Sequence, residues 1–78
     1  MIKKGKEMSL ESKIKHQYDS VIGAFGDADT EQLRIRRHAY AVGYALARLR
    51  QRSDVQWPEE MGFNIRAQAD LVEQVVAG

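Results

Sequence analysis

Residues 31–52 place the strongest constraint on the fold, because Gly43 is the only helix breaker in this long stretch. At about 100° per residue, apolar side chains would cover more than half of the circumference of a helix here. A helix packed on one neighbour needs a narrower apolar stripe, so we expect this helix to be central. The expected buried face is Ile35, Ala39, Val42, Leu46 and Leu49, with Leu33, Tyr40, Tyr44 and Ala47 beside it, Arg34, Arg37, Ala41, Ala45 and Arg48 opposite, and His38 at the edge.

Two further helices are predicted. The first covers residues 10–25, where apolar residues recur at helical spacing between Ser9, an N-cap residue, and Gly26, a C-terminal residue that tolerates positive φ. The second covers residues 65–76 after the cap residue Asn64. Its expected apolar stripe is Ile65, Ala69, Val72 and Val76, with Leu71 and Val75 beside it.

The connections contain turn signals. Before the central helix, Asp29 and Gln32 have the spacing of a capping box, and Thr30 is the competing cap. Pro58, two glutamates and Gly62 predict one short helical turn near residues 58–61. The predicted fold class is therefore all-α: a compact three-helix domain over residues 9–78, with helices at about 10–25, 31–52 and 65–76, after a basic N-terminal tail at residues 1–8.

Charge is distributed unevenly along the 78 residues, although the net charge is only +1. Residues 1–26 have a formal charge of +2, residues 27–53 have +3 and residues 54–78 have −4. Such asymmetry indicates either a partner surface or pairing inside the chain. A chain of this length buries only about 60–65% of its unfolded surface, so a partner or self-association would add stability.

Enzymatic and metal-binding signals are weak. The absence of cysteine excludes disulfides, thiolate nucleophiles and cysteine-based zinc sites. His16 and His38 fall in different helices, and no phosphate-binding glycine motif is present. His16, Asp19 and Ser20 share one side of a helix, which we interpret as a solvated polar face. We therefore expect a non-enzymatic protein with no catalytic residues, cofactor or metal.

No segment is suited to a membrane. The longest mostly apolar stretch, residues 39–47, is far shorter than the roughly 20 residues that span a bilayer. We expect a soluble, cytoplasmic protein without membrane contacts.

The arginines suggest one partner class. The basic residues near the two ends of the central helix are all arginine, whose planar fork suits phosphates and carboxylates. The candidate contacts to nucleic acid or to an acidic partner are Arg34, Arg36, Arg37, Arg48, Arg50 and Arg52, with lysines at 3, 4, 6, 13 and 15 adding backbone contacts. The alternative is internal: the acidic residues of the last third neutralise these arginines, and the last three suit the negative end of their own helix.

Apolar side chains suggest another partner class. Tyrosine, tryptophan and methionine are enriched at protein interfaces, and this chain has more of them than three short helices need. The small residues Ala39, Gly43 and Ala47 form a row that lets another helix approach, from the same chain or from a second copy. The candidate interface is Ala39, Tyr40, Val42, Gly43, Tyr44, Leu46, Trp57, Met61 and Phe63, of which Ala39, Val42, Gly43 and Leu46 would form the seam of a homodimer.

Two functions follow as hypotheses. The first is a small non-enzymatic protein-binding module, an adaptor or inhibitor of a larger macromolecular partner, of the size that phages and mobile elements encode. The alternative is a small nucleic-acid-binding regulator that uses the arginine-rich ends of the central helix.

Overall fold

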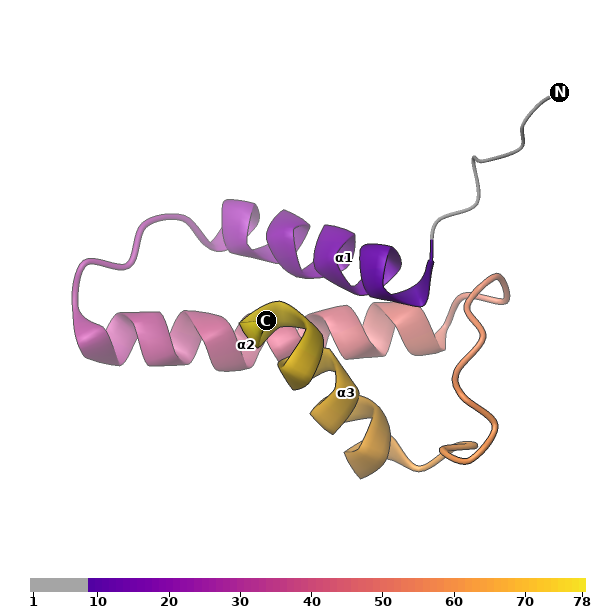
Figure 1. Ribbon diagram of the computed structural model, residues 1–78. Helices are drawn as coiled ribbons and strands as arrows, with labels where there is room; N and C mark the ends of the chain where they lie inside the picture. Colours follow the sequence, from indigo (N-terminus) through magenta and orange to yellow (C-terminus); the bar gives the residue numbers. More distant parts are fainter. Residues whose placement is uncertain (1–8) are drawn as a thin grey trace, which may run out of the picture.

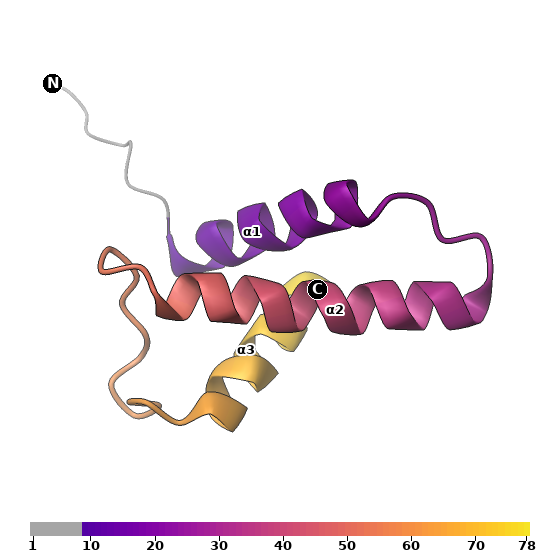
Figure 2. The ribbon, with the colours of Figure 1, turned by 180° about the vertical axis from the view of Figure 1, so that it is seen from behind.

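The computed structural model describes residues 9–78 and consists of three helices with their connections. Helix α1 spans Leu10–Phe25, α2 spans Glu31–Arg50 and α3 spans Ile65–Ala77. Helices α1 and α2 lie side by side in opposite directions, and α3 crosses the C-terminal half of α2 (Figures 1 and 2). The all-α, three-helix prediction is confirmed. The predicted basic tail at residues 1–8 lies outside the described residues.

Side-chain and backbone caps fix the ends of α1 where the sequence predicts them. The Ser9 hydroxyl accepts a hydrogen bond from the Ser12 backbone N–H at 3.1 Å, which satisfies one of the free donors of the first turn. At the other end, the Gly26 N–H donates to the Ile22 carbonyl at 3.1 Å. Gly26 has φ 93° and ψ −159°, a conformation essentially limited to glycine. Residues 10–25 are therefore helical as predicted.

The other two helices also begin at side-chain caps. The Thr30 hydroxyl accepts from the Leu33 N–H at 3.1 Å, and the Asn64 side-chain oxygen accepts from the Ala67 N–H at 3.1 Å. Thr30, the competing cap, thus begins α2, and the capping box predicted at Asp29 is wrong. The Thr30 hydroxyl already accepts from the Leu33 N–H three residues ahead, so this donor does not need the Asp29 side chain as an acceptor.

Helix α2 ends at Arg50, two residues before the predicted end. The N–H groups of Gln51 and Arg52 bond to carbonyls three residues back, at 3.2 Å each, so the last turn tightens and the helix stops. At residues 58–61 a single hydrogen bond from the Met61 N–H to the Pro58 carbonyl, 3.0 Å long, closes a turn in place of the expected helical turn. The connection then leads into α3 (Figure 1).

The core combines all three helices with the segment between α2 and α3. Side chains on α2 form its centre, and the half-buried Trp57 packs against them from the connection. The central position predicted for the second helix is therefore confirmed, since α1 and α3 both pack on α2 and α2 contributes more buried residues than either of them. The buried cluster consists of Ile14, Val42, Leu46, Leu49, Val55 and Val72.

The buried face of α2 differs from the predicted face at its edges. Ala41 and Ala45, expected on the opposite side, are both 0% exposed. One turn earlier, Arg37 and His38 hydrogen-bond to residues at or near α1, which places the two alanines on the side of α1. Small side chains there allow α1 to approach closely. The expectation that they lie opposite the core is therefore wrong.

Three residues expected to face the core are exposed instead. Ile35 is 62% exposed, because α3 does not reach the N-terminal end of α2 (Figures 1 and 2), and Ala39 is also exposed. Ile65, predicted in the apolar stripe of α3, is 56% exposed because α3 diverges from α2 toward its own N-terminal end. Further along α3, Val72 is buried and Val76 packs against the core, as predicted.

Candidate interaction surface

A row of aromatic side chains lies along the side of α2 away from its buried residues; Tyr40 and Tyr44 are exposed and Phe25 is half-buried. The rings of Tyr40 and Tyr44 are 5.6 Å apart, and the ring of Phe25, at the end of α1, is 5.8 Å from Tyr40. The guanidinium of Arg48 lies 5.5 Å from the centre of the Tyr44 ring, in cation–π contact. We call these four residues the aromatic surface.

Helix geometry explains this arrangement. Tyr40, Tyr44 and Arg48 are four residues apart, so their side chains follow one another along one side of α2. Tyr40 is 52% exposed and Tyr44 is 46% exposed, so neither ring belongs to the core. Contacts between these side chains restrict their rotation.

The predicted interface residues separate into exposed and buried groups. Ala39, Gly43 and Phe63 are exposed along with the two tyrosines, and Trp57 and Met61 are half-buried. Val42 and Leu46 are each only 7% exposed and belong to the chain's own core. A homodimer seam that includes these two residues is therefore wrong for this fold, because their side chains already fill the space between the helices.

The row of small residues remains open. Ala39, Gly43 and Ala47 are all exposed, and within residues 9–78 a methyl group placed on Gly43 would meet no atom within 4 Å other than those of its two neighbours and the backbone of its own helix. The expectation that another helix of the same chain packs on this row is wrong. The alternative expectation, a second copy, stays a prediction.

Within residues 9–78, three of the six candidate arginines form hydrogen bonds or ion pairs, and Arg48 contacts the Tyr44 ring. Arg37 donates to the Gly26 carbonyl at 2.9 Å, Arg50 donates to the Gln68 side-chain oxygen, and Arg52 pairs with Asp54. Internal neutralisation by the acidic last third applies to Arg52 alone, since the other two acceptors are uncharged. The remaining candidates, Arg34, Arg36 and Arg48, are exposed and form no ion pair within residues 9–78.

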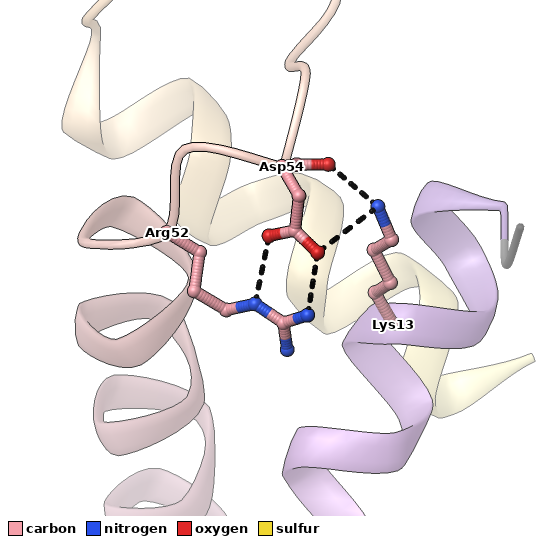
Figure 3. A network of polar contacts seen from close by, with 3 residues as sticks. All are labelled: Lys13, Arg52 and Asp54. Atoms are coloured by element: carbon pink, nitrogen blue, oxygen red, sulfur yellow. Dashed lines mark hydrogen bonds and ion pairs between the residues drawn. The ribbon is translucent and has the colours of Figure 1, made fainter.

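Asp54 connects the end of α2 to α1 (Figure 3). Its carboxylate accepts two hydrogen bonds from Arg52, at 2.9 and 2.7 Å, and the Lys13 ammonium donates to its backbone carbonyl at 2.6 Å. The hydrogen bonds from Arg52 lower the pKa of the Asp54 carboxyl below its ordinary value and raise the pKa of the guanidinium. This contact stabilises the turn that follows α2.

A histidine joins all three helices. The His38 ring lies between Tyr18 of α1, whose hydroxyl is 2.8 Å from Nδ1, and Glu73 of α3, whose Oε1 is 2.6 Å from Nε2. With a neutral imidazole, Nε2–H donates to the carboxylate and Nδ1 accepts from the tyrosine hydroxyl. No local sequence signal predicts this link, because Tyr18 and Glu73 lie 20 and 35 positions from His38 along the chain.

The same three residue types occur in proton-transfer sites, but the chemistry here favours a structural role. Burial raises the pKa of the Tyr18 hydroxyl above its ordinary value, so the hydroxyl is a weaker acid and less available as a nucleophile. His16, Asp19 and Ser20 are exposed on α1, as the solvated-face interpretation expects. Across residues 9–78, no group of three histidine or acidic side chains is arranged to hold a metal ion.

A buried amide fixes the turn before α3. Gln68 is 1% exposed; its Oε1 accepts from Arg50 of α2, and its Nε2 donates to the Gly62 carbonyl at 2.8 Å. The Asn64 N–H also donates to the Met61 carbonyl at 2.9 Å. Gly62 has φ 52°, which a residue with a side chain rarely adopts. The backbone on both sides of Phe63 is therefore held in place.

Comparisons with known proteins add no function to this geometry: no family model, no curated protein and no solved structure matches the chain. Among residues 9–78, none of the helices combines the length and the apolar character needed to cross a bilayer.

Proposed function

We propose that this chain is a non-enzymatic protein-binding module, an adaptor or inhibitor of a larger partner, which binds through the aromatic surface. The exposure of Tyr40 and Tyr44 in contact with each other is the observation that carries the proposal. Tyrosine and arginine are enriched among the residues that dominate binding energy at protein interfaces. These two half-exposed rings lie on a helix that is already formed. They can bury apolar area on binding without the cost of folding a segment.

The charge of α2 indicates the chemistry of the partner. The helix carries five arginines and one glutamate, a formal charge of +4 with His38 neutral. Arg48 lies within the aromatic surface, and Arg36 stands one helical turn before Tyr40. We therefore propose a partner surface with apolar side chains bordered by acidic residues, which would match both features. The cytoplasm is the compartment in which we expect this binding.

Nucleic-acid binding is the alternative function, and the engagement of three arginines weighs against it. Arg36 and Arg48 are twelve residues apart, which corresponds to about 18 Å along a helix. Arg34 and Arg36 thus form one basic spot and Arg48 forms another, with the two tyrosines between them along α2. An array of phosphate contacts needs a more continuous basic surface.

The proposal is tested by comparing matched exposed substitutions on the full chain. Proteins captured by the wild type are identified and purified. Each is then titrated with the wild type, with the double variant Tyr40→Ser/Tyr44→Ser and with the control Ile35→Ser, which changes an exposed apolar residue elsewhere on α2. We expect the double variant to weaken binding about tenfold or more, and Ile35→Ser to leave it unchanged. Equal binding by the two variants would contradict the proposal.

A fluorescence anisotropy titration with duplex DNA and single-stranded RNA tests the alternative. Tight binding that falls steeply with salt, and that Arg34→Ala/Arg36→Ala weakens for all sequences, would favour the nucleic-acid-binding regulator instead.

A further inference from the structure

We infer that a second copy of this chain docks head-to-tail on the aromatic surface, through the exposed turn that precedes α3. This turn, residues 59–65, is called the acidic turn here. It contains Glu59 and Glu60 and no basic residue, and it exposes Phe63 and Ile65. The inference rests on the proposed function, because the aromatic surface supplies one side of the contact.

Phe63 is the most anomalous side chain of the molecule. It is 91% exposed, although a phenylalanine of a small domain is normally at least half-buried. Backbone flexibility does not explain the exposure, because hydrogen bonds hold the backbone on both sides of Phe63. The buried Gln68 side chain donates to the Gly62 carbonyl, and the Asn64 N–H donates to the Met61 carbonyl. A fixed backbone that presents an apolar ring to solvent is typical of a contact site.

The charges of the two surfaces are complementary. Within residues 9–78, the acidic groups Glu59, Glu60 and Asp70 form no ion pair, and neither do Arg34, Arg36 and Arg48 of α2. Both surfaces are exposed in the same fold, so one chain does not cover its aromatic surface with its own acidic turn. In a contact between two copies, the acidic turn of one copy brings its glutamates close to the arginines of the other. Its Phe63 and Ile65 then meet the tyrosines of the aromatic surface.

Such a contact joins two different surfaces, and this geometry has a distinct consequence. A head-to-tail pair keeps one unused aromatic surface, on one copy, and one unused acidic turn, on the other, so association continues with rising concentration unless a ring closes. Low salt should favour association, because the charges at the rim of the contact are exposed. Two variants that each lack one surface should fail to associate alone and should pair when mixed.

The experiment measures the mass of the full chain by sedimentation and light scattering over a range of concentrations, for Tyr44→Ser, Phe63→Ser and their equimolar mixture. We expect the wild type and the matched control Ile35→Ser to associate, each single variant to associate about tenfold or more weakly, and the mixture to form a 1:1 pair. Both substitutions are at exposed sites, and circular dichroism verifies that each variant retains its helices.

The alternative outcomes each overturn the inference. If the wild type stays monomeric at every concentration, the chain does not associate with itself. If Phe63→Ser still associates like the wild type, the acidic turn is not in the contact, and if the mixture stays monomeric, the two surfaces do not bind each other. The proposed function fails separately: a monomeric chain that loses a captured partner on Tyr40→Ser/Tyr44→Ser refutes only the head-to-tail contact.

Discussion

Replacing Gly43 by alanine is expected to stabilise the protein. Gly43 lies in the middle of α2, has no positive φ, and offers open space for a methyl group. The substitution therefore adds no clash, while alanine loses less backbone freedom than glycine when the chain folds. Glycine in a helix interior is about 0.8–1 kcal/mol less favourable than alanine, so the free energy of unfolding should rise by about that amount.

The measurement is thermal unfolding followed by circular dichroism, at a concentration low enough to keep the chain monomeric. For a domain of this size, the expected stabilisation raises the midpoint temperature by about 3–8 °C. Gly26→Ala is the matched control, because it adds the same methyl group, also in open space, to a backbone with φ 93°. That conformation strains alanine, so the control should lose about 1–3 kcal/mol.

A lower midpoint for Gly43→Ala would refute this reasoning, since it would require some group to pack against the exposed face of α2. A higher midpoint for Gly26→Ala would refute the role assigned to its backbone conformation. A change in mass with Gly43→Ala alone would instead favour the row of small residues as a contact between copies.

Three further predictions concern the core and its polar contacts. Leu49→Ala removes a fully buried side chain, and we expect a loss of about 2–5 kcal/mol in urea unfolding; a loss below 1 kcal/mol would contradict its core position. Tyr18→Phe removes the hydroxyl bonded to His38 and should cost about 0.5–1.5 kcal/mol at neutral pH. Because the folded-state pKa of Tyr18 is raised, its contribution is complete below about pH 10 and is lost as the pH rises through that higher value, so Tyr18→Phe should lose less stability in alkali than the wild type. The pKa of Asp54 is lowered, so its contribution is present above its ordinary value of 3.8 and is lost as the pH falls through the lower folded value. Asp54→Asn should therefore flatten the acid side of the stability profile measured by urea unfolding, and an unchanged acid side would contradict this role of Asp54.

The candidate surface could be predicted from the sequence only in part. Residue type alone identified Tyr40, Tyr44 and Phe63 as interface candidates, and all three are exposed. It also assigned Val42 and Leu46 to the interface, because the spacing of apolar residues in a helix is the same whether they pack in the core or against a partner. Phe25 was not among the predicted interface residues, since its contact with Tyr40 depends on how α1 lies against α2.

Local chemistry by itself determined the number of helices and nearly all of their ends. Ser9 and Asn64 cap the N–H groups three residues ahead, and Gly26 adopts a backbone conformation closed to most other residues. These interactions lie within four residues of one another, so no tertiary contact is needed to anticipate them. The same holds for the broad apolar circumference of α2, which predicted its central position.

Only the tertiary structure decided which side of α2 is buried. The circumference of α2 is apolar enough that several of its faces could pack in a core. The position of α1 buries Ala41 and Ala45, whereas Ile35 stays exposed because α3 does not reach it. The bonds of His38 to two other helices, and of Gln68 to α2 and the acidic turn, likewise depend on distant segments. Helical periodicity fixes which side chains share a face, but the burial of a face requires a neighbour, and the neighbours come from elsewhere in the chain.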